Sequence, residues 1–97
     1  MKFISEILEV IHNQAAQRFE LQIGAFTPVL DYPLQGERIA FTHTGVPTAL
    51  EGSGIGSFVV RAGLDYAREQ GYKVISLCSF MVAYIRRHPE YEDLLNK

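Results

Sequence analysis

The sequence has one cysteine, no tryptophan and no surplus of basic residues, and these shortages exclude several classes of protein. Cys78 alone cannot form an internal disulfide, which argues against a disulfide-stapled secreted domain. Nine Lys and Arg against eleven Asp and Glu give a formal net charge of −2, without the basic excess typical of nucleic-acid binding. No apolar run approaches the ~20 residues of a membrane span. Residues 1–13, with two Glu and no long apolar core, do not resemble a signal peptide, so we expect a cytoplasmic protein that binds neither nucleic acid nor membrane.

What is present fits one soluble domain over residues 1–97, with 47% hydrophobic and 21% charged residues. The first half is strand-like. Residues Arg18–Ile23 alternate apolar and polar side chains, Val29–Leu34 forms an edge-like strand beside prolines, and Glu37–Thr44 forms a third strand. Short connections join them into an antiparallel meander. Residues 4–12 fit a helical stripe and a short strand equally, and both interpretations stay open.

The second half changes period. An apolar stripe predicts a helix from Gly54 to Gln70, closed by Gly71. Lys73–Leu77 is a β-branched run that should return as a strand, and Phe80–Arg87 resumes helical spacing before Pro89 and a last turn. Strands first, then helix, strand and helix, predict an α+β fold, a mixed α/β sandwich.

The segment Glu51–Ser57 lies between a strand and the predicted helix and contains Gly52, Gly54 and Gly56. In that position main-chain N–H groups and the helix dipole can hold a pyrophosphate. The spacing matches neither a P-loop, which ends in Gly-Lys-Ser/Thr, nor the G-x-G-x-x-G dinucleotide fingerprint. The alternative is an ordinary loop whose glycines serve only the turn.

Several segments together resemble the minimal GNAT-like N-acetyltransferase family of about a hundred residues. The resemblance covers residues 9–95 and is carried by Phe41-Thr42-His43-Thr44-Gly45-Val46-Pro47, Leu50-Glu51-Gly52-Ser53-Gly54-Ile55-Gly56, Val74-Ile75-Ser76-Leu77-Cys78-Ser79-Phe80, Tyr84-Ile85 and Arg87-His88-Pro89-Glu90-Tyr91. It implies a shortened GNAT fold in which the strand before the glycine loop splays away from the strand that ends at Cys78.

The resemblance also implies acetyl-CoA as the cofactor, with its pyrophosphate on the glycine-loop amides and its pantetheine near Val46. The cofactor-binding residues implied are Val46, Glu51, Gly52, Ser53, Gly54, Ile55, Gly56 and Ser57. At Glu51 such proteins usually carry Gln or Arg, and at Ser53 close relatives carry a basic residue. Both departures weaken the attraction for phosphate.

Acetyl transfer to an amine needs a base, oxyanion donors and an acid for the leaving thiolate. Cys78 stands where a strand gives way to a helix, whose N-terminus lowers a thiol pKa, although free cysteines are also often buried fillers. His43 has the strand parity of Phe41, which predicts that it points to the apolar side as a base or a partner of Cys78, or as a core histidine. Tyr84 is either core or an acid.

His88 is expected to bind the last carbonyls of its helix, and Arg86 and Arg87 leave the helix about 100° apart, so only one can face a given ligand group. The sequence thus predicts an acetyl-CoA-dependent N-acetyltransferase acting on a primary amine of a small molecule or protein. A non-catalytic CoA-binding or interaction module is the alternative. We expect no metal, and a homo-oligomer stays open.

Overall fold

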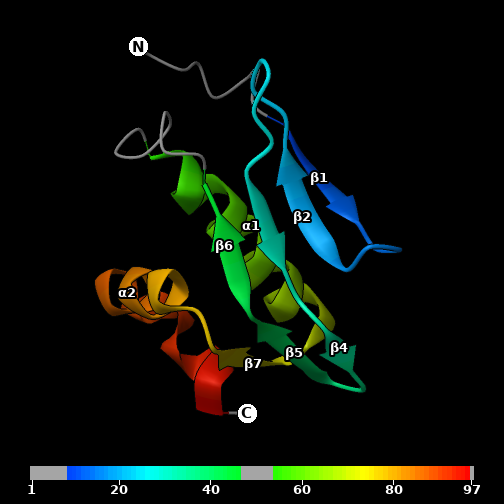
Figure 1. Cartoon of the computed structure of the whole chain (residues 1–97). Coiled ribbons are helices and arrows are strands. Elements are labelled where there is room, and N and C mark those ends of the chain that lie inside the picture. The colour runs from blue at the N-terminus through cyan, green and yellow to red at the C-terminus, as the bar shows by residue number, and fades with distance from the viewer. Residues whose placement is uncertain (1–8, 47–53, 97) are drawn as a thin grey trace.

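The computed structural model of the chain describes residues 9–46 and 54–96. The described residues form seven strands and three helices, with six strands first and then helix, strand, helix and a last short helix, which is the general order the sequence predicts (Figure 1). The strands are β1 Val10–Asn13, β2 Arg18–Leu21, β3 Val29–Asp31, β4 Leu34–Gln35, β5 Arg38–Phe41, β6 His43–Gly45 and β7 Lys73–Ser76. The helices are α1 Ile55–Gln70, α2 Ser79–Arg87 and the 3-10 helix η3 Pro89–Asn96.

The strands form two sheets. The first is wholly antiparallel in the order β1-β2-β3-β6, and the second has the order β4-β5-β7 with β5 and β7 parallel. A parallel pair needs a crossover connection, and α1 provides it. The expected meander is therefore correct for β2 and β3, whereas the strand predicted at Val29–Leu34 ends at Asp31, and Leu34 belongs to the second sheet.

The strand predicted for residues 37–44 is broken at Thr42. After the break, the alternation of side chains between the two faces of the sheet is reversed. Phe41, at the end of β5, is fully buried, and in β6 the residue on that same side is Thr44, which pairs with a buried residue of β3. Three positions separate Phe41 from Thr44, which is what one extra residue in a strand produces. The prediction that His43 points to the apolar side is wrong, because its side chain is exposed.

The core lies between the sheets and α1. The helix runs from Ile55 to Gln70 as its apolar stripe predicts, and Gly71 ends it in the left-handed conformation that closes many helices. Gly63 lets the helix approach the sheets closely, since a Cβ there would lie 2.6 Å from Leu30 Cδ2 and 2.9 Å from Phe41 Cε1. No helix among the described residues is long and apolar enough to cross a bilayer.

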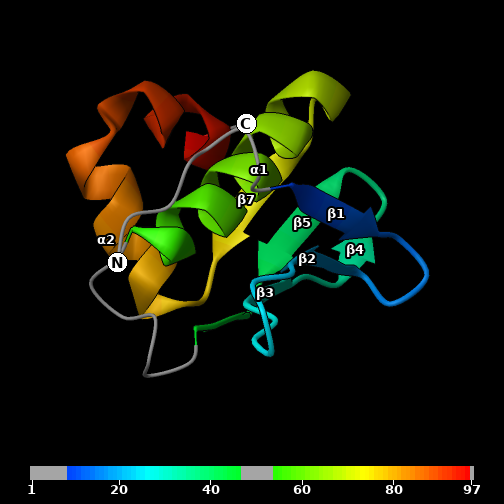
Figure 2. The same cartoon turned by 90° about the horizontal axis from the view of Figure 1, so that it is seen from above.

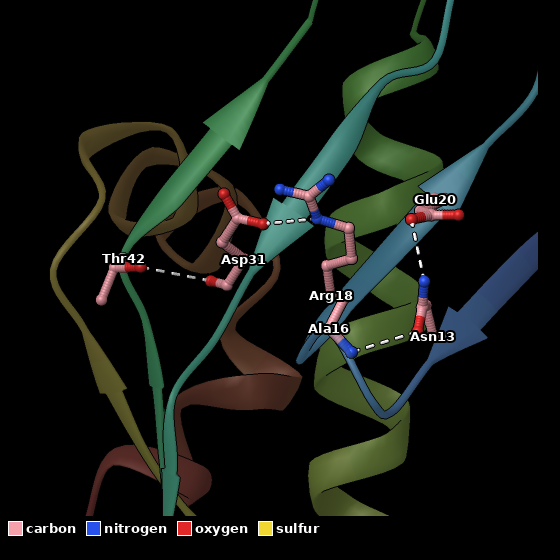
Figure 3. Close-up of polar contacts among 6 residues, drawn as sticks. All are labelled: Asn13, Ala16, Arg18, Glu20, Asp31 and Thr42. Atoms are coloured by element: carbon pink, nitrogen blue, oxygen red, sulfur yellow. Dashed lines mark hydrogen bonds and ion pairs between the residues drawn. The ribbon is translucent and has the colours of Figure 1, made fainter.

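All three helices lie on one side of the sheets, as Figure 2 shows. The opposite side carries no described element, and we call it the open face. In the second sheet the open face presents Arg38, Ala40, Lys73, Ile75 and Leu77, none of which is buried. In the first sheet the open face presents polar side chains, and there Arg18 Nε donates to Asp31 Oδ1 at 2.9 Å. Figure 3 shows these side chains in front of the strands, with α1 behind the strands.

The segment left open between helix and strand overlaps β1, Val10–Asn13, so the strand interpretation holds from Val10 onward. Residues 1–8 lie outside the described residues. β1 contributes His12 to an aromatic cluster: its ring stacks on Phe19 with centroids 4.1 Å apart, contacts Tyr66 edge-on, and hydrogen-bonds to the Tyr32 hydroxyl. β1 is therefore tied to α1 through these rings.

We expect the free energy of unfolding to fall as the pH drops below 6.5 because of His12. Burial lowers the pKa of His12 from its ordinary 6.5, so the folded chain binds this proton less readily than the unfolded chain. Its contribution is complete above pH 6.5 and is lost as the pH falls through the folded pKa. Urea unfolding at pH 7.5 and 5.5 measures the difference. The variant His12→Phe, which has no titrating ring, should lose less stability over this interval, and an identical loss would contradict the assignment.

Candidate active site

Cys78 lies at the point where the two sheets part. The pairing of β5 with β7 ends at the hydrogen bond from Leu77 N to Phe41 O, 3.1 Å long, after which β6 pairs only with β3. Cys78 is the N-cap residue of α2 and is half-buried. Across the parting strands its thiol donates a hydrogen bond to the Thr44 hydroxyl, with Sγ 3.3 Å from Oγ1. This splay of β6 from β7 is the geometry that the family resemblance implies.

The surroundings of Cys78 favour its thiolate. Burial by itself raises the pKa of the thiol. It is outweighed in the ionised form, in which the Thr44 hydroxyl can turn its hydrogen toward the sulfur and the main chain at Met81, Phe80 and Thr44 also donates, so the pKa of Cys78 lies below its ordinary 9.0. Donors at the start of a helix are a common cause of such lowering. These hydrogen bonds therefore make the Cys78 thiol easier to ionise than an ordinary cysteine.

His43 does not share this environment. Successive residues of a strand point to opposite faces, so with Thr44 directed at Cys78, His43 projects from the open face. There it lies beside Gly45, since its Nε2 is 3.0 Å from the place a Cβ of Gly45 would take, and it pairs across the sheet with Asp31. The side chain that contacts the Cys78 thiol is thus Thr44 and not, as expected, His43.

Tyr84 is 7% exposed and belongs to the main core. Its ring stacks on His88 with centroids 4.0 Å apart, and His88 Nδ1 donates to the Tyr84 carbonyl at 2.9 Å, as expected of a helix-end histidine. Burial raises the pKa of the Tyr84 hydroxyl, so the group stays protonated at neutral pH. The core interpretation of Tyr84 is therefore confirmed, and its acid role stays a prediction.

The glycine loop is described only from Gly54 onward; Glu51, Gly52 and Ser53 lie outside the described residues, and Val46 directly follows β6. Gly54 is the N-cap of α1 with φ at 84°, a conformation that favours glycine. A Cβ at Gly56 would lie 2.6 Å from the Phe80 ring. The backbone conformation at Gly54 and the close approach of Phe80 at Gly56 therefore account for these two glycines without a ligand.

At the start of α1, two main-chain donors have no partner among the described residues. No side chain caps the helix at Gly54, its first turn has no acidic residue, and the Ser57 amide is bonded to Gly54 O at 3.2 Å. Within the described ranges no hydrogen bond occupies the N–H groups of Ile55 and Gly56. Such N–H groups, with the helix dipole, attract an anion.

A hollow of about 120 Å³ lies between this helix start and α2. It is lined by Ser57, Phe80, Ala83, Tyr84 and Arg87. Arg86, the neighbouring cation, lines a separate hollow beside Ser76 and Leu95. The prediction that the two arginines diverge is confirmed, and Arg87 is the one on the side of α1.

Sequence reasoning missed two residues of this region, Thr44 and Phe80. Thr44 reaches Cys78 only because of the break at Thr42, which local alternation does not show. Phe80 does carry a signal: it lies two positions after Cys78 and is 41% exposed despite being aromatic. This exposed aromatic ring lies close to Cys78 in the sequence and lines the hollow at the start of α1.

Comparisons with known proteins agree with this geometry. The family model described as GCN5-related N-acetyl-transferase matches residues 18–94. The proteins NATD1 of Gallus gallus and Mus musculus are each 29% identical to this chain over 85 residues, which cover 84% of this chain and 77% of the relative. A GCN5-like protein of Staphylococcus aureus, solved by NMR in solution, is 27% identical and superposes with a TM-score of 0.71 over 90% of this chain and 86% of that one. Since the family model spans most of the sequence and the fold agrees, the chain belongs to the GCN5-related N-acetyltransferase family and is an N-acetyltransferase.

Proposed function

We propose that this N-acetyltransferase takes its acetyl group from acetyl-CoA and transfers it to a primary amine, and that Cys78 lies at the reacting centre. The family generally uses acetyl-CoA, which supplies an activated acetyl thioester. The observation that carries the proposal is the uncapped start of α1, where the N–H groups of Ile55 and Gly56 have no partner among the described residues. The hollow beside them leads to Phe80 and thus toward Cys78.

The proposed binding residues follow from this placement. The N–H groups of the loop residues Glu51 to Ser57 hold the pyrophosphate, and Arg87 adds the positive charge that Glu51 does not provide. The pantetheine arm lies along the main chain that follows β6, at Val46, which packs with Ile55. In this arrangement the chain needs no basic side chain within the loop itself.

The proposed reacting groups are those predicted from the sequence, with their tasks adjusted. Cys78 either accepts the acetyl group or protonates the departing thiolate, and Thr44 holds its sulfur. His43 projects from the open face and is suited to take the proton of an amine that arrives on that side. Tyr84, which stays protonated at neutral pH, is the proposed acid.

An amide-resolved NMR titration with acetyl-CoA tests the binding site. The largest shifts are expected at the Ile55 and Gly56 amides, and thermal stability should rise as binding adds about 3 kcal/mol at a hundredfold excess over Kd. Arg87→Gln should weaken binding roughly fivefold, while Arg86→Gln, on the other side of α2, should not. Shifts centred elsewhere, or no stabilisation, would overturn the proposal.

A further inference from the structure

Two cations stand side by side on the open face, and no described residue forms an ion pair with either of them. Arg38 of β5 and Lys73 of β7 are direct neighbours in the parallel pairing, so their side chains leave the sheet on the same face. Like charges directly opposite each other destabilise a sheet. Among the ion pairs of the described residues, neither cation takes part in one. An anionic partner would remove this repulsion.

The surface next to these cations is apolar and hollowed. A hollow of about 210 Å³ runs from Arg38 over Ala40 and Ile75 to Leu77. Leu77 is 66% exposed, the largest exposure among the exposed large apolar side chains of the described residues, and it directly precedes Cys78. The hollow thus runs from Arg38 along the open face to Leu77, the residue that precedes the proposed reacting thiol.

Its length suits a peptide. Cys78 follows Lys73 by five residues, which is about 16 Å of extended chain at ~3.3 Å per residue. A small amine that carries a carboxylate cannot span this distance. An extended peptide can, with an amine at one end and acidic side chains three to five residues away.

We propose that the acetyl acceptor is an acidic peptide segment of a protein, which lies extended on the open face with its carboxylates at Arg38 and Lys73 and its amine at Cys78. The position of the amine rests on the function proposed above, whereas the docking of the acidic segment does not. Two cations are too few for a nucleic acid, whose binding surfaces need clustered basic residues. A second copy docked symmetrically through this patch would bring the same cations together.

Binding is tested without acetyl-CoA by fluorescence anisotropy with two labelled seven-residue peptides. Both have one lysine followed by alanine and leucine, and they differ only in carrying two Glu or two Gln at the fourth and fifth positions after the lysine. We expect the Glu peptide to bind at least fivefold more tightly, and more tightly still at low salt. The double variant Arg38→Gln and Lys73→Gln should abolish the preference, while Arg86→Gln on the helix side should retain it.

Equal binding of the two peptides, or a preference that survives the double variant, would overturn the proposal. So would light scattering that shows a dimer dissociated by Leu77→Asp, because a second copy would then be the occupant. An acetylation assay separates this inference from the proposed function. Selective binding without acetylation would refute the placement of the amine at Cys78 but not the docking surface. Equal acetylation of both peptides would refute the acidic acceptor while leaving the activity intact.

Discussion

Replacing Cys78 with alanine is expected to lower acetyl transfer from acetyl-CoA by at least about 100-fold, the usual cost of losing a group that moves a proton or an acyl group in the transition state. The thiol is half-buried and small, so the fold should survive its loss. Product formation measured by mass spectrometry checks the result. A lasting mass increase of one acetyl group on Cys78 of the wild-type chain would assign it the acyl-accepting task.

Thr44 provides the graded control for this prediction. Thr44→Val removes the hydroxyl that lowers the pKa of Cys78, so the thiol should need a higher pH to ionise, and its alkylation at pH 7 should slow. Thr44→Ser keeps a hydroxyl and should restore the faster alkylation. A Cys78→Ala enzyme that retains more than a tenth of the activity would refute the catalytic task, and an unshifted alkylation profile for Thr44→Val would refute the contact.

Replacing Gly63 with valine is expected to lower the free energy of unfolding by about 2 to 3 kcal/mol. The new side chain would enter space held by Leu30 and Phe41, both fully buried, so neither ring nor methyl group can swing into solvent. For a domain of this size the loss should lower the melting temperature by roughly 10 °C or more. Urea unfolding, with an unchanged slope, gives the size of the effect.

Gly56→Val is the matched control in the same helix. Its added atoms would also meet a ring at 2.6 Å, but that ring is Phe80, which is 41% exposed and can turn outward. Its cost should therefore be much smaller than that of Gly63→Val. Equal costs for the two variants would show that the core around Gly63 is as yielding as the surface.

The sequence is informative where one local rule decides the structure. The stripe from Ile55 onward and Gly71 define α1, and the β-branched run at Lys73 becomes β7. The sequence is uninformative where one segment pairs with two different sheets. Up to Phe41 the segment pairs with β7, and after Thr42 it pairs with β3. This change of partner depends on distant strands, and it decides that Thr44 and not His43 faces Cys78.

The site shows the same division. The position of Cys78 at a strand-to-helix junction could be predicted from the local pattern, and so could the divergence of Arg86 and Arg87. The single-sided arrangement of the helices could not, because periodicity assigns each helix a buried stripe without saying which face of the sheet receives it. Consequently the sequence does not predict the open face with Arg38 and Lys73.

The hydrogen bond between Cys78 and Thr44 joins residues 34 positions apart, and the α1 crossover between them must be complete before it can form. Ionisation of the thiol is therefore linked to folding. The folded thiol releases its proton more readily than the unfolded one, so between the folded pKa and 9.0 the native state gains stability as the pH rises. In an unfolded chain Cys78 loses this hydrogen bond and ionises as an ordinary cysteine, so the pH at which the thiol ionises reports whether the chain around it is folded.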